Sequence, residues 1–250
     1  MKKIILLSLV LVSFLFASCE YDNYDAPSVT ISGNLTYNGK KLPFDGNSGR
    51  SLLKVVQTGY GKVDSGTAIQ VDTDGKFTQL LFPGEYWLTP YNNQYPFEFE
   101  QFTNLGSGLG YDSIHIELKK NLEMDIEVIP YYEVRDYTAS LQGTDMLMKF
   151  KVVKSTDTKK AAPAIKKVRL YVSTSSIVST YTTCNVVKDV NVTTDAELEI
   201  SMPIASYQNG YVNNFRDYAF CRVAIELENI PNYYLFSEVK KLEGLPMKGK

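Results

Sequence analysis

Two short stretches of the chain mix aromatic rings with side-chain amides. The first stretch supplies Trp87, Tyr91, Asn92, Asn93, Tyr95 and Phe97. The second stretch supplies Tyr207, Gln208, Asn209, Tyr211, Asn213, Asn214 and Phe215. Sugars present apolar ring faces that stack on aromatic side chains and hydroxyls that hydrogen-bond with amides, so each stretch is a candidate glycan-binding site. The alternative for each stretch is that its rings are buried in a core or at a domain interface.

Residues that could support catalysis or hold a metal ion are few. The one histidine, His115, falls on the polar face of an alternating stretch. A Ser-His-Asp triad or a histidine-ligated metal site would therefore have only this histidine available. Asp72 and Asp74 precede a glycine as in a calcium loop, but the downstream bidentate glutamate is missing. Glu98 and Glu100 are two residues apart and point the same way on an extended chain, unlike a glycosidase pair. We therefore predict no catalytic residue, no metal ion, no cofactor and no enzyme activity.

The N-terminal residues have the order of a secretory signal peptide. Two lysines follow Met1, an apolar run covers residues 4–16, and the small pair Ala17-Ser18 precedes Cys19. The apolar run is shorter than the roughly 18 to 20 residues that span a bilayer. A cysteine at this place resembles a bacterial lipobox, although Phe16 stands where leucine is more common. The resemblance implies that residues 1–18 are removed and that Cys19 carries a lipid anchored in a membrane.

The tether behind this cysteine, residues 20–27, is polar and acidic. Acidic residues at this place resemble the signal that sends lipoproteins of Bacteroidetes-type bacteria to the outside of the outer membrane. The resemblance implies a lipid-anchored protein of the outer membrane that faces the cell exterior. The alternative is an ordinary solvated linker that points into the periplasm.

Two further cysteines, Cys184 and Cys221, remain once Cys19 is assigned to the lipid. An even pair in an export compartment can form a disulfide. Two buried free thiols are the equal alternative.

Charge argues against nucleic acid as a partner. Removing residues 1–18 takes away two lysines and no acid, which leaves 24 basic against 28 acidic residues. Nucleic-acid binding needs an electrostatic footprint of clustered lysine and arginine, and so mild a charge balance offers none. We expect a monomer that contacts a membrane through its lipid alone.

The remaining sequence has the composition and alternation of a β protein. Tyrosine (18 residues) and phenylalanine (12 residues) are frequent, as they are in strands. Apolar and polar residues alternate over 29–37, and Asn38-Gly39 follows as a two-residue hairpin turn, since both turn positions need positive φ. Tyr86 and Leu88 alternate into the core, which leaves Trp87 exposed or at a domain junction.

We predict an all-β chain with two tandem β-sandwich domains. The signal peptide covers 1–18, the lipidated cysteine and tether cover 19–27, and the two sandwiches cover 28–120 and 121–250. The second half holds six or more short alternating stretches separated by turn residues, a pattern typical of an Ig-like or fibronectin-like sandwich.

The first half also resembles a known sandwich. "VTISGNLTYNGK" followed by "VDTDGKFTQLLFPGEYWLT" is similar to the transthyretin-like or carboxypeptidase-regulatory-like (prealbumin-like) domain. Members repeat an opening strand with a glycine, an Asp-Gly turn before an aromatic residue and a Pro-Gly turn before Tyr-x-Leu. The resemblance implies a scaffold that usually carries no active site.

The chain as a whole is similar to a Bacteroidetes family of two-domain lipoproteins of unknown function. "MDIEVIPYYEV" and "FCRVAIELENIPNYYLFSEVKKL" carry the resemblance in the second half. Members are typical of polysaccharide-utilisation loci, which implies as partners a polysaccharide or oligosaccharide, an outer-membrane importer and its glycan-binding lipoproteins. The expected function is non-catalytic glycan binding at the cell surface, or assistance to such an importer. The alternative is a structural or adhesive envelope protein that acts through protein–protein contacts.

Overall fold

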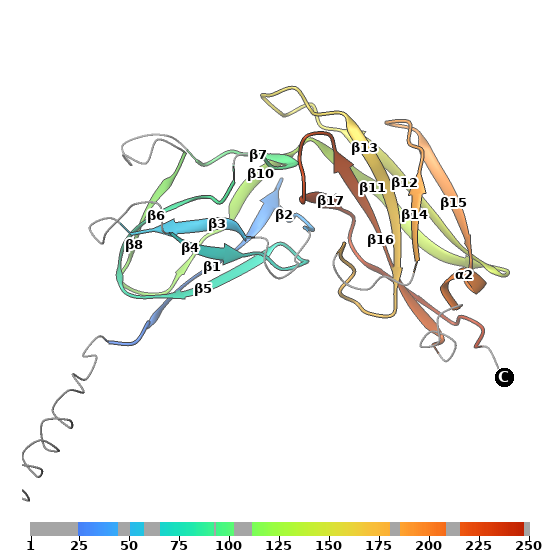
Figure 1. Ribbon diagram of the computed structural model, residues 1–250, viewed down its shortest axis with the longest axis horizontal. Helices are drawn as coiled ribbons and strands as arrows, with labels where there is room; N and C mark the ends of the chain where they lie inside the picture. The colour runs from blue at the N-terminus through green and yellow to red at the C-terminus, as the bar shows by residue number, and fades with distance from the viewer. Residues whose placement is uncertain are drawn as a thin grey trace, which may run out of the picture.

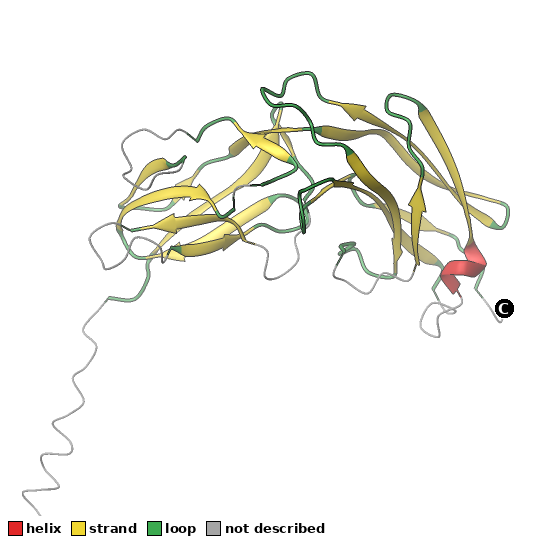
Figure 2. Cartoon of the chain, turned by 45° about the horizontal axis from the view of Figure 1, so that its top comes forward, coloured by secondary structure: helices red, strands yellow, loops and turns green. Residues whose placement is uncertain are grey.

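The structure, a computed structural model, describes residues 25–44, 51–57, 66–92, 94–102, 112–180, 186–208 and 216–247. Almost all of the regular structure of these residues is β, with one short helix among them, in the second domain, as Figure 2 shows. The strands form two tandem β-sandwich domains that lie side by side (Figure 1), which confirms the predicted fold class. No helix among the described residues is long and apolar enough to cross a membrane.

The first domain contains β1 (Val29–Tyr37), β2 (Lys40–Lys41), β3 (Ser51–Val56), β4 (Thr67–Gln70), β5 (Lys76–Leu81), β6 (Gly84–Pro90), β7 (Phe97–Phe99), β8 (Ile114–Leu118), β9 (Leu122–Glu123) and β10 (Ile126–Pro130). The second contains β11 (Tyr132–Gln142), β12 (Asp145–Lys154), β13 (Ile165–Ser173), β14 (Val186–Val190), β15 (Glu197–Pro203), α2 (Ile204–Gln208), β16 (Tyr218–Leu227), β17 (Tyr234–Phe236) and β18 (Lys240–Glu243).

Strand β1 organises the first domain. It lies in a sheet ordered β2-β1-β10-β7, to which β5 and β9 also pair through β1. The second sheet is ordered β4-β3-β6-β8. Alternate residues of β1 and β6 point inward, so Ile31, Tyr86 and Leu88 are buried between the sheets. The predicted turn after β1 is confirmed, with φ of 52° at Asn38 and 69° at Gly39.

Gly33 allows the close packing of β1 against the segment that follows β9. A Cβ atom at this position would lie 1.8 Å from the carbonyl oxygen of Met124, well inside van der Waals contact. The backbone N–H of Met124 donates to the carbonyl of Ser32 at 2.9 Å, which fixes the two chains at this distance. A side chain at position 33 therefore cannot be accommodated without moving one strand.

The domain boundary lies about ten residues later than the sequence predicted. Residues 121–130 were assigned to the second sandwich, but β9 and β10 both pair in parallel with β1. Leu35 pairs with Ile126, and the carboxylate of Glu127 accepts a hydrogen bond from the hydroxyl of Thr36 at 2.6 Å. Alternation identifies these residues as strands but does not tell which sheet they join, so the sequence alone places the boundary too early.

The second domain packs the sheet β11-β12-β15 against the sheet β14-β13-β16-β17, with β18 paired to β16. Its core comes from the inward faces of the central strands: Met148, Phe150, Val152, Leu170, Val223 and Ile225 are fully buried. Lys188 on β14 donates to the carbonyl of Ser201 on β15 at 2.9 Å and so ties two edge strands of opposite sheets.

The two domains share one continuous hydrophobic core, which includes buried residues of both. Phe44 of the first domain forms a β-bridge with Leu235 of the second and packs against the ring of Tyr233 at 6.0 Å. The guanidinium of Arg222 on β16 donates across the junction to the carbonyls of Phe44 and Thr73, at 3.3 and 3.1 Å. The junction is thus apolar in its centre and held by directed hydrogen bonds beside it.

Candidate functional site

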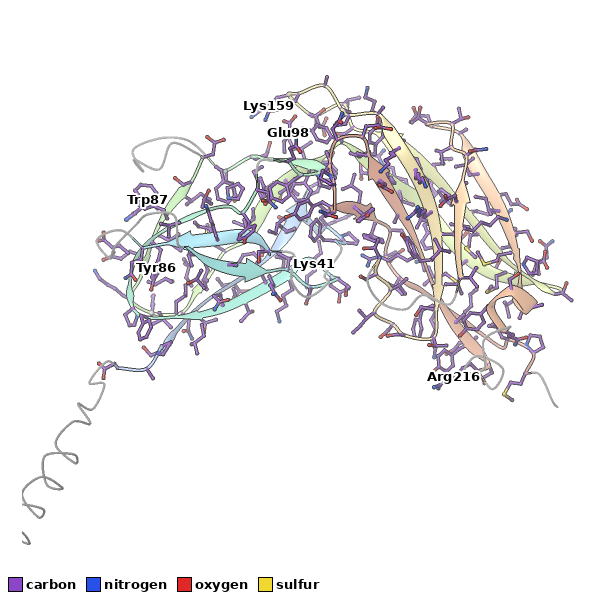
Figure 3. All side chains as sticks on the ribbon, viewed as in Figure 1. Lys41, Tyr86, Trp87, Glu98, Lys159 and Arg216 are labelled. Carbon is purple, nitrogen blue, oxygen red and sulfur yellow. The ribbon has the colours of Figure 1, made fainter. Side chains whose placement is uncertain are left out.

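A pocket of about 860 Å³ lies where the two domains meet. Its first-domain wall comes from the middle of β3, the end of β6, β7 and neighbouring segments. Its second-domain wall comes from the β12–β13 loop and the turn after β16. The residues that line it are Lys54, Thr89, Pro90, Tyr91, Asn92, Gln94, Tyr95, Phe97, Glu98, Phe99, Phe102, Asp112, Tyr131, Lys159, Lys160, Pro163, Glu228, Asn229 and Ile230. Glu98 and Lys159 lie close together at the top of the junction in Figure 3.

The inner wall of the pocket is a cluster of packed rings. Tyr95 stacks on Phe97 with ring centroids 5.5 Å apart and an interplanar angle of 12°. Phe99 meets both rings edge-on at 5.3 Å, and Phe102 meets Phe99 edge-on at 4.9 Å. Tyr95, Phe97 and Phe102 are buried, so most of this cluster serves as a rigid apolar wall.

Two tyrosine hydroxyls join this wall to both domains. The Tyr95 hydroxyl donates to the carbonyl of Leu52 at 2.9 Å and accepts from the backbone N–H of Asn92 at 2.6 Å. Tyr233 of the second domain donates its hydroxyl to the carbonyl of Ser51 at 3.2 Å and accepts from the Asn92 amide. Burial raises the pKa of Tyr95 far above its usual value. The Tyr95 hydroxyl therefore stays protonated, and the hydrogen bonds of both hydroxyls hold the wall in place.

Tyr91 is the exposed ring of the pocket. Its side chain is 45% accessible, and its backbone N–H donates to the carbonyl of Leu52 at 2.9 Å. The neighbouring residues Asn92 and Gln94 are also exposed, and the Asn92 amide nitrogen donates to the Tyr233 hydroxyl. The rim thus combines one accessible aromatic face with amide groups on a backbone that is fixed by hydrogen bonds.

Glu98 fastens the second-domain wall to the first domain. Its two carboxylate oxygens accept hydrogen bonds from the backbone N–H groups of Lys159 and Lys160, at 2.9 and 2.7 Å. The same loop is held from β1, because the Tyr37 hydroxyl donates to the Asp157 carboxylate at 2.8 Å. Glu98 therefore serves as a clamp between the domains. Glu100, which would have to complete a glycosidase pair with Glu98, does not line the pocket.

The structure brings together Tyr91, Asn92, Tyr95 and Phe97 of the first predicted cluster in this pocket. Trp87 is not part of it. The indole lies on the outer face of β6, half-buried, with its ring 4.9 Å from that of His115 on β8, and Figure 3 shows it at the far side of the first domain. Asn93 lies outside the described residues.

At the residues that the structure describes, the second predicted cluster does not form an exposed binding site. Tyr207 on α2 is completely buried, and its hydroxyl donates to the carbonyl of Tyr218 at 2.9 Å. It is a core residue, because the helix packs it beneath β16, and burial raises its pKa to about 12. Asn209, Tyr211, Asn213 and Asn214 lie outside the described residues.

Of the two alternatives for Cys184 and Cys221, a disulfide or two buried free thiols, the structure shows the free thiol at Cys221. Cys221 on β16 is a buried free thiol whose pKa is raised to about 12 by burial, while Cys184 and Cys19 lie outside the described residues. Among the residues with described structure, no group of three or more His, Cys, Asp or Glu side chains could hold a metal ion.

Sequence reasoning missed the second-domain wall. Lys159, Lys160, Pro163, Glu228 and Asn229 come from a loop and a turn that carry no aromatic or catalytic pattern. The β12–β13 loop is a long polar insertion between two regular strands, and loops of this kind on rigid scaffolds often carry function. That length was the only available signal.

Comparisons with known proteins agree with the two-domain division. Residues 29–129 match the model of the DUF3823 N-terminal domain, described as a protein of unknown function. Residues 132–241 match the DUF3823_C model, described as a domain of unknown function. The search of curated proteins finds no match.

Solved structures of similar fold span nearly the whole chain. A DUF3823 family protein from Parabacteroides merdae is 24% identical with a TM-score of 0.68, and one from Bacteroides ovatus is 22% identical with a TM-score of 0.67. Each alignment covers 88% of this chain and 100% of the other. A candidate carbohydrate binding protein from Bacteroides uniformis is 13% identical with a TM-score of 0.63, over 87% of this chain and 100% of that one. The chain belongs to the DUF3823 family, a family of unknown function in Bacteroidetes, and carries both of its domains in order.

Proposed function

We propose that the pocket between the two domains binds carbohydrate. The observation that carries the proposal is the exposed ring of Tyr91 beside the amides of Asn92 and Gln94, on the rim of a pocket with an aromatic wall. The volume of about 860 Å³ is within the range of small-molecule sites and would take a short oligosaccharide. An accessible ring can stack on a sugar face while amides and carboxylates bind its hydroxyls.

The rigidity of the site supports this proposal. The backbone of Tyr91 is bonded to Leu52, and the neighbouring wall is fixed by the hydroxyls of Tyr95 and Tyr233. A site that is already ordered loses little conformational entropy when it binds, which matters for a ligand as strongly hydrated as a sugar. The related protein from Bacteroides uniformis, a candidate carbohydrate binding protein, is in line with this function.

We propose binding without catalysis. Of the lining carboxylates, Glu98 is held by two backbone N–H groups as the clamp between the domains, which favours a structural role for it. We further propose that Cys19 carries a lipid that anchors the protein to the outer membrane, with the pocket presented to glycans destined for a neighbouring importer. A Cys19→Ala variant should leave the membrane fraction and appear as soluble protein; persistence with the membrane would contradict the anchor.

The test is a glycan-array screen on protein that lacks residues 1–20, followed by calorimetry on the best ligand. Tyr91→Ala removes the exposed ring and should weaken binding by about 1–2 kcal/mol, or about 5- to 30-fold. Trp87→Ala is the matched control, because it removes an aromatic side chain from β6, just before Tyr91 in the chain but outside the pocket. That variant should bind within about twofold of the unaltered protein.

The outcomes separate the site from the function. Binding weakened by Tyr91→Ala alone supports the pocket. Binding weakened by Trp87→Ala alone would move the site to the outer face of β6. Absence of binding across plant, host and microbial glycans would overturn the proposed function.

A further inference from the structure

The second-domain wall of the pocket carries two adjacent lysines on a fixed loop. Lys159 and Lys160 lie between β12 and β13, and both side chains are exposed. Their backbone N–H groups are bound by Glu98, and the preceding Asp157 is bound by the hydroxyl of Tyr37. Three hydrogen bonds from the first domain therefore set the position of this pair at the pocket, although the pair belongs to the second domain.

Neither ammonium group forms an ion pair within the described part of the chain. Other lysines of the second domain do so with nearby carboxylates; Lys149 pairs with Glu199 at 2.7 Å and Lys166 pairs with Glu226 at 2.7 Å. Glu98 is the acidic residue bound to the lysine pair, but its oxygens are occupied by backbone N–H groups and not by the ammonium groups. The two positive charges are thus available to a ligand.

The other charged residues of the lining are one lysine and two acids. Lys54 adds a positive charge to the first-domain wall. Asp112 and Glu228 are exposed and also line the pocket. These two carboxylates accept hydrogen bonds from sugar hydroxyls and repel an anionic group, so an acidic saccharide must place its charge at the lysines and its hydroxyls at Asp112 and Glu228. Adjacent ammonium groups gain more from an anionic group than from a hydroxyl, because hydrogen bonds between opposite charges are stronger.

We infer that the pocket selects acidic saccharides, whose carboxylate or sulfate groups are bound by Lys159 and Lys160. This inference rests on the proposed function and names the class of glycan. A uronic acid residue and a sulfated sugar share the anionic group, and the lysines recognise that charge. Lysine suits such a role as a compact, mobile cation that adapts to either group.

The test compares three tetrasaccharides by calorimetry: a tetramer of galacturonic acid, a sulfated galactan tetramer and a neutral galactose tetramer. The unaltered protein should bind one of the two acidic ligands at least about tenfold more tightly than the neutral one. The double variant Lys159→Gln/Lys160→Gln should lose that preference. The matched control is Lys119→Gln/Lys120→Gln, an adjacent lysine pair after β8 that does not line the pocket and changes net charge equally.

The salt dependence of binding is a second readout, and a purely structural role of the loop would not change it. Binding of the acidic ligand should weaken several-fold between about 0.05 M and about 0.5 M sodium chloride, and the Lys159→Gln/Lys160→Gln variant should lose that dependence. Tighter binding of the galacturonic acid tetramer identifies a uronate ligand, and tighter binding of the galactan identifies a sulfated one; either supports the inference. Equal or tighter binding of the neutral tetramer overturns the inference and leaves the glycan function intact. An array screen in which no glycan binds overturns both.

Discussion

Replacing Arg222 by methionine tests how the two domains are joined. The guanidinium is only 1% accessible. It donates to the carbonyls of Ser237 at 2.8 Å and Val178 at 2.9 Å within the second domain, and to those of Thr73 and Phe44 in the first. It also lies over the ring of Phe236, 4.1 Å from its centroid. Methionine fills similar space but leaves the carbonyls without these donors.

The magnitude follows from those contacts. A hydrogen bond from a charged donor contributes about 1.5–3 kcal/mol, but bonds in one network are not additive. Because the carbonyls belong to the backbone, they remain buried after the substitution and cannot be replaced by apolar groups. We therefore expect the free energy of unfolding to fall by about 3–5 kcal/mol, the usual cost of breaking a buried charged network. For a chain of this size that loss corresponds to a fall in Tm of about 6–20 °C.

The assay is urea unfolding together with differential scanning calorimetry. Two of the four hydrogen bonds cross the junction, so the Arg222→Met variant should also separate the unfolding transition into two, with the first domain less affected. Arg216→Met is the control, because Arg216 is exposed in the same domain and should change stability by less than about 0.5 kcal/mol. A loss below about 1 kcal/mol for Arg222→Met, with one unchanged transition, would refute the assigned role.

Two further predictions concern the core. Gly33→Ala should destabilise the protein by about 3 kcal/mol or more in urea unfolding, because its Cβ would overlap the carbonyl of Met124. The control Ser32→Ala should cost less than about 1 kcal/mol. Similar losses for both variants would contradict the close packing at Gly33. The Cys221 thiol has its pKa raised to about 12, so the unfolded chain releases this proton near pH 9 while the folded chain keeps it. The stability contributed by that thiol is therefore complete below about pH 9 and is lost as the pH rises from 9 towards 12. Over this range the unfolding free energy of Cys221→Ala should fall less steeply with pH than that of the unaltered protein. Identical slopes for the two proteins would contradict this prediction.

Local patterns predicted the first strand, the β character of the chain and several side-chain orientations. The hairpin turn at Asn38-Gly39 and the inward positions of Tyr86 and Leu88 follow from short-range geometry, and all are found in the structure. The exposed position of His115 follows from the same alternation. These features depend on residues that are neighbours in the sequence, so the sequence is sufficient to predict them.

The errors arise where distant segments meet. Alternation could not show that β9 and β10 pair with β1, so the domain boundary was placed about ten residues early. Tyr207 has the same aromatic and amide neighbours as Tyr91, but α2 buries the first and the end of β6 exposes the second. The second-domain wall of the pocket depends on the contact between Glu98 and a loop about sixty residues later in the chain. No local sequence pattern predicts this contact.

The most direct test of the central claim is a crystal structure of the protein with the tightest-binding oligosaccharide from the array. The account predicts density for the sugar in the pocket between the domains, stacked on Tyr91 and within hydrogen-bond distance of Asn92 or Gln94, with an anionic group near Lys159 or Lys160. Density for the sugar on the outer face of β6 at Trp87, or anywhere else outside the pocket, would contradict it.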